Sequence, residues 1–301
     1  MAIAVIGTTA NEGTCRLVER WRELGLDVQL VHPLDAHRLT PPVVAIARLD
    51  VSPNLDGIEP GLLQLLFAER RGIDVRNPVH ALLASHDKLR TAWLLARAGV
   101  PHPPTRHLPP GSGLDIAPPV VLKPRYGSWG TAVRRCTTPK EIDEYFVDAR
   151  ATPWYRRHGV LAQAEVPSPG HDLRVLVAGG RVVGAVERVA AEGEWRTNIS
   201  CGGYSRPATV SDAARELALT AAAVTDADLV GVDLLPVGES YVVVELNGAV
   251  DFDATYSFAG EDVYAAAAAA LALLSAGSEP RISPRSVRDL SDARVTFAQQ
   301  R

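Results

Sequence analysis

Three polar residues late in the sequence have the chemistry of metal ligands. Glu245 and Asn247 are two positions apart in the run YVVVELN, so on a β-strand both side chains point to the same face. If the preceding turn is symmetric about Glu239, Asp233 of the run LVGVDLL lies opposite Glu245, about 5 Å away at Cβ. Two carboxylates and an amide oxygen suit Mg²⁺, with Mn²⁺ as an alternative. Each residue alone is equally explained as a polar strand end, but facing carboxylates repel unless a cation lies between them.

A second group of residues could bind phosphate. In the run VLKPRYGSWGTAV, Lys123 ends an expected strand and is followed by Gly127, Ser128 and Gly130. A lysine supplies a point charge for a phosphate, and a glycine-rich turn lets backbone N–H groups approach phosphate oxygens closely. The run is not a Walker A loop, because no GKS or GKT follows the glycines. Taken alone, it is better explained as an ordinary hairpin turn.

A third group is rich in arginine. Asp172 and Arg174 begin one expected strand, Arg188 ends the next, and Arg196 and Asn198 follow in the run WRTN. A single arginine is more often a solvated surface residue than a ligand. Arg174 and Arg188, however, lie in strands whose pattern is half buried, and planar guanidinium groups suit the binding of phosphate or carboxylate. These residues therefore indicate an anion-binding surface.

The elements that must position these groups alternate in type. Short apolar runs at residues 3–6, 28–31 and 43–47, with a helical pattern that stops at Gly25, predict a small parallel sheet covered by helices within residues 1–85. The run TPKE at residues 138–141 is a capping-box pattern, with Pro139 in the first helical position, that begins a helix running to about Arg150. Other helices are expected from Pro60 to Gly72 and at residues 87–98, 213–224 and 262–274, and strands at residues 120–123, 131–136 and 161–166, with hairpins at 173–178/181–189 and 229–235/241–247.

Composition limits the class of protein. A length of 301 residues suggests two or three compact units, and 47% hydrophobic with 22% charged residues is typical of an ordinary soluble protein. A net charge of -4 makes nucleic acid a poor candidate partner. Cys15, Cys136 and Cys201 are scattered, which favours reduced thiols over disulfides or a zinc site. We recognise no signal peptide or membrane span, so the sequence predicts a cytoplasmic protein without a membrane partner.

The motifs also occur in a familiar order. The runs DKLRTAWLLARAGVPHPPT, VLKPRYGSWGTAV, LAQAEV, GHDLRVLVAGGRVVGAVER, EWRTNISCGG, VGVDLL and VVVELNGA together resemble ATP-grasp ligases of the RimK type, over residues 1 to about 275. That group includes the glutamate ligase acting on a ribosomal protein tail and the amino-group-carrier ligases of lysine and arginine biosynthesis. The resemblance implies an α/β fold with a pre-ATP-grasp domain (residues 1–85), a small α+β lid (86–160), a C-terminal ATP-grasp domain (161–277) and a tail (278–301).

The resemblance also implies roles for individual residues. Lys88 and Lys123 correspond to phosphate-contacting lysines, and the glycine run after Lys123 corresponds to a mobile phosphate loop. Arg188 and Asn198 correspond to groups facing the transferred phosphate, and we place Arg174 and Arg196 with them as catalytic residues. The nucleotide site further includes a hinge that contacts adenine through its backbone, with Asp172 nearby; the hinge residues are Gln163, Ala164, Glu165 and Val166. The metal ligands implied are Asp233, Glu245 and Asn247, in agreement with the strand geometry.

The activity implied is ATP-dependent joining of a carboxylate to an amine through an acyl phosphate, with release of ADP and phosphate. The expected substrates are a small-molecule carboxylate and amine of the amino-acid kind, or the tail of a carrier or peptide, and we expect a homodimer or homotetramer. Two alternatives remain at this level: a cyclo-ligase or dipeptide ligase of small-molecule biosynthesis, and a non-catalytic ATP-binding regulatory protein.

A co-substrate site is predicted at the N-terminal domain. Arg48 and Asp50 follow the strand expected at residues 43–47, and in open α/β sheets ligands bind beyond the carboxyl ends of the strands. Asp50 could bind an ammonium group and Arg48 a carboxylate, with Arg174 and Arg196 facing them from the C-terminal domain. The alternative is that Arg48 and Asp50 pair with each other at the surface.

Overall fold

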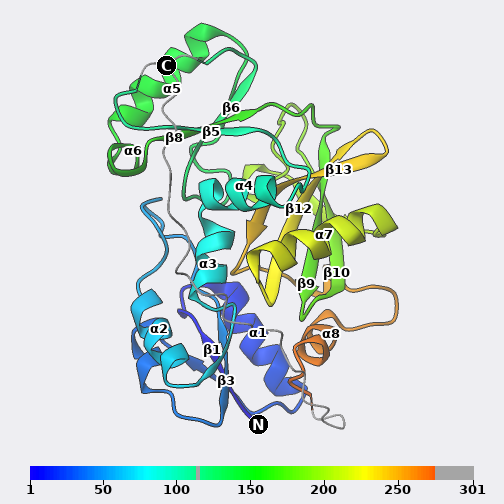
Figure 1. Ribbon diagram of the computed structural model, residues 1–301. Coiled ribbons are helices and arrows are strands. Elements are labelled where there is room, and N and C mark those ends of the chain that lie inside the picture. The colour runs from blue at the N-terminus through cyan, green and yellow to red at the C-terminus, as the bar shows by residue number, and fades with distance from the viewer. Residues whose placement is uncertain (113–115, 275–301) are drawn as a thin grey trace.

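The computed structural model describes residues 1–112 and 116–274, whose named strands form three separate β-sheets (Figure 1). In Figure 1 the N-terminal sheet lies at the bottom, the largest sheet in the middle and the third sheet at the top. The mixed α/β fold class predicted from the sequence is confirmed.

The N-terminal sheet is parallel, as predicted for residues 1–85, with the strand order β2-β1-β3-β4. Its strands are β1 (Ala2–Ile6), β2 (Val28–Val31), β3 (Val43–Ala47) and β4 (Asp74–Arg76). All five residues of β3 are buried, as expected for a parallel strand covered on both faces. Helix α1 (Glu12–Glu23) covers one face, and η1 (Pro33–Arg38), α2 (Leu62–Arg70) and α3 (Val79–His86) cover the other. Strand β4 and helix α3 were not predicted from the sequence.

The sheet at the top of Figure 1, which we call the lid, is antiparallel with the order β5-β8-β6-β7. Its strands are β5 (Thr105–Leu108), β6 (Val120–Pro124), β7 (Arg134–Cys136) and β8 (Val160–Ala164), and α5 (Pro139–Arg150) and α6 (Pro153–His158) pack on it. The predicted capping box of α5 is present at Thr138 and Glu141. The strand predicted over residues 131–136 is too long, because residues 131–133 lie in a turn in which Ala132 has a φ of 54°.

The largest sheet has the order β11-β10-β9-β12-β13. Both predicted hairpins are confirmed, and the strands are β9 (His171–Ala178), β10 (Arg181–Val189), β11 (Tyr204–Pro207), β12 (Leu229–Val237) and β13 (Ser240–Asn247). Helices α4 (Lys88–Arg97) and α7 (Asp212–Thr225) cover one face. Helix α8 (Val263–Ala270) packs on the other, and it is shorter than the predicted 262–274 because Asp262 is its N-cap and Leu271 its C-cap.

One face of this sheet changes character along its strands. Side chains two apart on a strand share a face, so Asp172, Arg174, Leu176 and Ala178 of β9 lie in one row. Leu176 and Ala178 belong to a core shared with α1, α8 and the N-terminal sheet. The charged pair continues the same row beyond that core, and the fold thereby places charged side chains beside the lid.

The three units are in contact. Helix α4, which the sequence analysis assigned to the lid, packs on α7 and β13 as well as on β5. The proposed domain boundaries at residues 85 and 160 stay predictions, and the boundary at 277 and the tail 278–301 lie outside the described residues. Within residues 1–112 and 116–274, no helix is long and apolar enough to cross a membrane.

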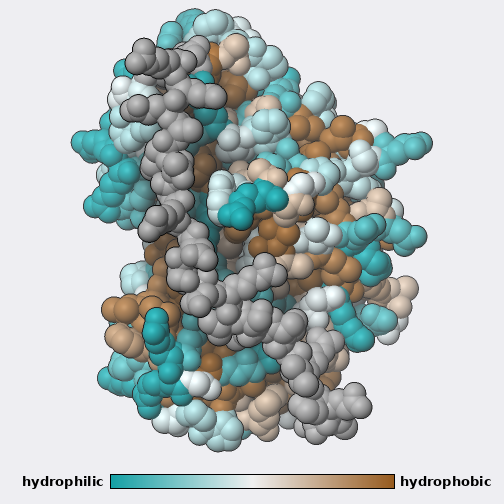
Figure 2. Space-filling model, viewed as in Figure 1, coloured by the Kyte–Doolittle hydropathy of each residue, from teal (hydrophilic) through white to brown (hydrophobic). Residues whose placement is uncertain are grey.

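The face seen in Figure 2 is polar over much of the lid, at the top and left of the view. An apolar group at the lower left lies over α2, on which Leu63 and Phe67 are 57% and 53% exposed. These two side chains are four residues apart and share one side of the helix. The homodimer or homotetramer expected from the sequence stays a prediction. Substitution of Leu63 or Phe67 would test whether this apolar surface forms the contact between subunits.

Candidate active site

One pocket collects most of the residues singled out from the sequence. It lies where the lid sheet, the segment after β8 and the charged end of the largest sheet meet. The predicted residues that line it are Lys88, Lys123, Gly127, Ser128, Gly130, Gln163, Ala164, Val166, Asp172, Arg188, Arg196, Asn198, Asp233 and Glu245. The predicted residues that do not line it are Arg48, Asp50, Glu165, Arg174 and Asn247.

The hairpin of β12 and β13 brings two carboxylates face to face. Asp233 pairs with Glu245, as the sequence predicts. The turn, however, pairs Val237 with Ser240 and is therefore not symmetric about Glu239. A β-bulge beyond Asp233 adds one residue to β13 and restores the pairing. Without the bulge Glu245 would point to the opposite face of the sheet, so this irregularity sets the geometry of the site.

Asp233 lies at the centre of a buried ionic network. Arg174 donates from Nε and Nη2 to its two carboxylate oxygens at 2.6 and 2.7 Å, and Arg188 Nη2 donates to Oδ2 at 2.8 Å. Arg188 also binds both oxygens of Asp172, which accepts from Thr197 Oγ1 as well. Burial would raise the pKa of Asp233, but Arg174 and Arg188 outweigh it and lower that pKa to about 2. The carboxylate is therefore charged at neutral pH.

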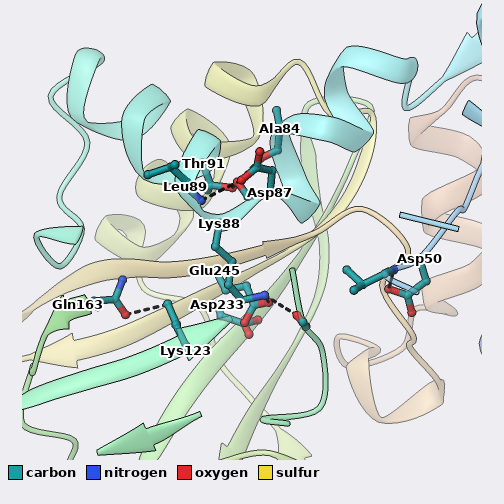
Figure 3. Close-up of polar contacts among 12 residues, drawn as sticks. Asp50, Ala84, Asp87, Lys88, Leu89, Thr91, Lys123, Gln163, Asp233 and Glu245 are labelled. Carbon is teal, nitrogen blue, oxygen red and sulfur yellow. Dashed lines mark hydrogen bonds and ion pairs between the residues drawn. The ribbon is translucent and has the colours of Figure 1, made fainter. Parts of the chain in front are cut away.

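The other carboxylate has a different partner. Lys88, the first residue of α4, extends toward Glu245 and places Nζ 2.8 Å from its Oε1, while also donating to the carbonyl of Gly127 (Figure 3). In this arrangement the ammonium group of Lys88 supplies the positive charge beside Glu245 that the facing carboxylates require. The Nδ2 of Asn247 is buried without a hydrogen-bond partner, although buried amides are normally paired.

The oxygen ligands fit a hard divalent cation only in part. Glu245 is 25% exposed at its side chain and is held by a single lysine, so its second oxygen can accept another partner. Asp233 Oδ2 already accepts two hydrogen bonds, whereas Oδ1 accepts one and keeps one lone-pair site. No group of three or more His, Cys, Asp or Glu residues suited to a metal occurs among the described residues. An amide oxygen from Asn247 would complete the set.

Lys123 enters the pocket from β6. It is 5% exposed, and its Nζ donates to Gln163 Oε1 at 2.8 Å (Figure 3). Burial lowers the pKa of Lys123 to about 8. Because both ends of the Gln163 side chain are hydrogen-bonded within the lid, the adenine contact predicted for residues 163–166 would have to come from the backbone.

The glycine-containing loop after β6 is docked on the segment that carries Asn198. Ser200 Oγ donates to the Trp129 carbonyl at 2.8 Å, and Arg196 Nη1 donates to the Gly130 carbonyl at 3.3 Å. A Cβ at Gly130 would lie 3.0 Å from Asn198 Oδ1, at a φ of 70°. Glycine therefore allows this close approach between the loop and Asn198.

Glu165 lies beside the pocket. It pairs with Arg135 of β7 at 2.8 Å, and its Oε2 is buried without a partner. Its neighbour Ala164 donates its backbone N–H to the carbonyl of Pro104. Glu165 thus attaches the start of the segment after β8 to β7, and Ala164 attaches the end of β8 to the residue before β5.

Arg48 and Asp50 lie apart from the pocket. Arg48 is 1% exposed, which excludes the alternative of a surface pair, and it donates to Thr14 Oγ1 and to the carbonyl of Val250 at 3.1 and 2.8 Å. Its Nη1 is buried without a partner, and burial lowers its pKa to about 10. Asp50 lies on the right in Figure 3, away from Lys88 and Glu245. Arg174 is bound to Asp233, and its predicted position facing Arg48 across a substrate stays a prediction.

Several polar residues around the site were not predicted from the sequence. Asp87 caps α4 and binds Arg125 at 2.5 Å, which attaches α4 to the end of β6. The signal was present, because Asp87 precedes Lys88 in the motif DKL. Thr197, which donates to Asp172, could also have been predicted, because it lies between Arg196 and Asn198 in the run WRTN. His86 is buried with an unpaired Nε2, and nothing in the sequence distinguished it from a core residue.

Two lysines, a glycine-containing loop and a carboxylate hairpin thus surround one pocket between the lid and the largest sheet, an arrangement suited to a phosphate-bearing ligand. Comparison with known proteins agrees with this interpretation. A family model described as the RimK-like ATP-grasp domain matches residues 85–271. A probable alpha-L-glutamate ligase of Alkalilimnicola ehrlichii is 32% identical over 83% of this chain and 88% of its own length.

Other relatives cover the chain to a similar extent. The ribosomal protein bS6–L-glutamate ligase of Escherichia fergusonii is 28% identical over 87% of this chain and 93% of its own length. The crystal structure of a RimK domain ATP-grasp protein from Sphaerobacter thermophilus superposes with a TM-score of 0.65 at 20% identity, covering 90% of this chain and 98% of that one. The chain belongs to the RimK-like ATP-grasp family. It is an ADP-forming enzyme that uses ATP to join a carboxylate to an amine.

Proposed function

We propose that the pocket binds Mg·ATP and activates a substrate carboxylate as an acyl phosphate, which an amino acid then attacks through its amine. The observation that carries this proposal is the convergence in one pocket of Lys88, Lys123, the loop at residues 127–130 and the Asp233–Glu245 pair. These groups come from three different parts of the chain. Their joint chemistry, cations and backbone N–H groups beside carboxylates, matches a metal-bound triphosphate.

The chemistry has two steps. A carboxylate oxygen of the first substrate attacks the γ-phosphorus, the bond from that phosphorus to the β,γ-bridging oxygen breaks, and ADP leaves. The amine nitrogen then attacks the acyl carbon, phosphate leaves with the electrons of the C–O bond, and the nitrogen gives up a proton. Phosphoryl transfer depends mainly on positioning and charge neutralisation, roles that suit Lys123, Arg188 and Asn198 at the pocket wall.

The cation in this proposal is Mg²⁺, held by Glu245, Asn247 and the free lone pair of Asp233 Oδ1. When bound, it neutralises charge on the phosphates and aligns them for transfer. Lys88 contacts only Oε1 of Glu245 and also donates to the carbonyl of Gly127, which lies in the glycine-containing loop. One lysine thus links the metal-binding carboxylate to the loop.

The test has a binding arm and a product arm. Calorimetry should detect Mg-dependent ATP binding to the purified chain without any other substrate, because the binding groups all belong to the chain. ADP release should then be screened over pairs of carboxylates and amino acids, with glutamate tested first because relatives are named glutamate ligases. The product mass distinguishes ligation to a peptide or carrier tail from dipeptide formation and from cyclisation. Absence of ATP binding at millimolar nucleotide would overturn the proposal.

The N-terminal unit is proposed to hold one of the two co-substrates. Five buried polar atoms without partners belong to residues at or just beyond the ends of β1, β3, α3 and β13; they are Thr8 Oγ1, Arg48 Nη1, His86 Nε2, Asn247 Nδ2 and Asp251 Oδ1. Unpaired buried polar atoms are rare in native proteins and call for an explanation. A zwitterionic substrate bound beside Asp50 would supply both donors and acceptors to this group.

Substitution of Asp50 tests this location. Asp50 is partly exposed, so Asp50→Asn should leave the fold unchanged while raising the KM of the amine substrate about tenfold and that of ATP by less than twofold. Arg48→Ala is a poorer test, since it removes a buried side chain that also holds the backbone at Val250. Unchanged kinetics for every substrate in Asp50→Asn would remove the N-terminal unit from the site.

A further inference from the structure

Three adjacent strands of the lid align a threonine, a glutamine and a lysine. Thr105 of β5 pairs directly with Gln163 of β8. On the other side of β8, Lys123 of β6 pairs with Leu161, so Lys123 and Gln163 are diagonal neighbours on one face of the sheet. Long side chains reach across such a diagonal. The three side chains are joined in the order Thr105, Gln163, Lys123.

The hydrogen bonds in this row have a fixed direction. Thr105 Oγ1 lies 3.0 Å from the carbonyl of Pro103 and must donate its single proton there, since a carbonyl only accepts. The hydroxyl can therefore only accept from Gln163, whose Nε2 lies 3.0 Å away. This orients the Gln163 amide with Oε1 toward Lys123, at 2.8 Å from Nζ. The orientation of the amide follows from the proton count and does not depend on a bound ligand.

We propose that Thr105 is a positioning residue for ATP binding: acting through the Gln163 amide, it fixes Lys123 so that its free ammonium protons face the nucleotide phosphates. Of the three protons on Nζ, one donates to Gln163, and tetrahedral geometry directs the other two away from it. The proposal rests on the phosphate-binding role given to Lys123 under the proposed function. It adds a residue that is absent from the lining of the pocket.

Loss of the hydroxyl has a defined consequence. In Thr105→Val the Gln163 Nε2 has no acceptor at this position, and the amide is free to turn by 180°. The turned amide presents N–H groups to an ammonium group, and two donors cannot hydrogen-bond. Lys123 then loses its fixed rotamer and has to be ordered by the nucleotide itself, which weakens binding. Threonine to serine keeps the hydroxyl and is the matched control.

The experiment measures Mg·ATP binding by calorimetry to the purified chain and to the variants Thr105→Val, Thr105→Ser, Lys123→Met and the double variant Thr105→Val/Lys123→Met. We expect Thr105→Val to raise the Kd for ATP about fivefold, a loss in keeping with one buried hydrogen bond, and Thr105→Ser to stay within twofold of the unsubstituted chain. Lys123→Met should weaken binding more strongly. In the Lys123→Met background Thr105→Val should have no further effect, because Thr105 acts through Lys123.

The possible outcomes separate this proposal from the one on which it rests. If Lys123→Met binds ATP as tightly as the unsubstituted chain, the phosphate role of Lys123 fails and this inference fails with it. If Lys123→Met weakens binding but Thr105→Val does not, only the positioning role is overturned. An equal effect of Thr105→Val in both backgrounds means that Thr105 acts on the fold rather than on Lys123, and also overturns it. Should Thr105→Val unfold, Gln163→Met removes the same link and should give the same fivefold loss.

Discussion

At the scale of single residues, the two facing carboxylates of the β12–β13 hairpin have opposite surroundings. Asp233 is 5% exposed at its side chain and neutralises two arginines, whereas Glu245 is 25% exposed and meets one lysine. Buried ion pairs are costly to break, because the remaining charge stays in a medium of low polarity. The same chemical change at the two positions should therefore give different results.

Glu245→Gln and Asp233→Asn form a matched pair of isosteric substitutions. Glu245→Gln should cost about 1 kcal/mol of stability or less, because Lys88 keeps an oxygen acceptor, yet lower ligation by about 100-fold or more through the loss of a metal ligand. Asp233→Asn should lose about 3–5 kcal/mol in the free energy of unfolding, since Arg174 and Arg188 are left without a counter-charge. Urea denaturation and ADP release measure both effects. Near-normal turnover of Glu245→Gln would show that the metal assignment is wrong.

The pH dependence of ATP binding should follow Lys123. Its pKa in the free protein is lowered by burial to about 8, and bound phosphates raise it again because they favour the charged form. Above the pKa of the free protein, ATP binding therefore requires Lys123 to take up a proton. The affinity for Mg·ATP should be constant below about pH 7 and should decrease as the pH rises through 8, by up to about tenfold per pH unit. Calorimetry between pH 6.5 and 9.5 checks this sign.

The control for this prediction is Lys123→Arg. A guanidinium stays protonated over the whole range, so its affinity for ATP should not decrease between pH 8 and 9.5, whatever its absolute value. A decrease of the same size in Lys123→Arg would assign the titration to another group.

At this scale the sequence supplied the identities of the pocket residues but not their partners. The types and spacing of Asp233 and Glu245 predict a cross-strand carboxylate pair, and the structure pairs them. Nothing local predicts that Arg174 binds Asp233, because the two residues are 59 positions apart and meet only when β9 and β12 become neighbours. Arg48 was expected at the surface or in a substrate site, yet its carbonyl partner lies 202 positions away.

At the scale of elements, irregular backbone is what sequence patterns predict least well. The bulge in β13 changes which face Glu245 occupies, and strict alternation of residues carries no sign of it. In the loop after β6, two residues that are not glycine also have positive φ, Trp129 at 60° and Ala132 at 54°. The loop therefore continues beyond its last glycine, and the strand predicted to start at residue 131 starts at Arg134. Long periodic segments such as α5 and α7 were predicted almost to the residue.

The docked loop should respond to nucleotide. Ser200 and Arg196, in the segment between β10 and β11, donate hydrogen bonds to two loop carbonyls, and a small local opening can break these bonds. Hydrogen exchange of residues 127–133 and of α5 should therefore slow when Mg·ATP binds, while exchange in β12 changes little. Ser200→Ala should speed exchange of the loop in the free protein, since it removes one of these bonds. Identical exchange with and without ATP would contradict a moving lid.

At the scale of the whole molecule, the N-terminal sheet and the largest sheet share a hydrophobic core, whereas the lid has its own. Side chains of β1, α1, β9, β10 and α8 belong to one cluster, and those of β6, α5 and α6 to another. The resemblance of the chain to a known family predicted the order of the units along the sequence. It did not predict that the N-terminal sheet and the largest sheet share one core, because that depends on contacts between residues far apart in the chain. The two sheets should therefore unfold together, and we expect any rigid-body motion to be that of the lid.

Asn77, which follows β4, connects the N-terminal sheet to the largest sheet through side-chain hydrogen bonds. It is 1% exposed, donates Nδ2 to the carbonyls of Leu229 and Gly248, and accepts at Oδ1 from the N–H groups of Asp228 and Leu229. Leu229 begins β12 and Gly248 follows β13, so one side chain holds both strands of the carboxylate hairpin at the end away from its turn. Its φ of 56° is a left-handed conformation that asparagine and glycine tolerate.

Two substitutions of Asn77 separate its hydrogen bonds from its backbone conformation. Asn77→Gly keeps the left-handed backbone but removes four hydrogen bonds made by the side chain, and it should lower the free energy of unfolding by about 3 kcal/mol or more. Asn77→Ala adds a strained backbone and should cost about 1 kcal/mol beyond that. Urea denaturation followed by tryptophan fluorescence and by circular dichroism measures both, and turnover should fall in each variant because the ends of β12 and β13 are released. If Asn77→Gly is within 1 kcal/mol of the unsubstituted chain, the N-terminal sheet does not support the hairpin through this residue.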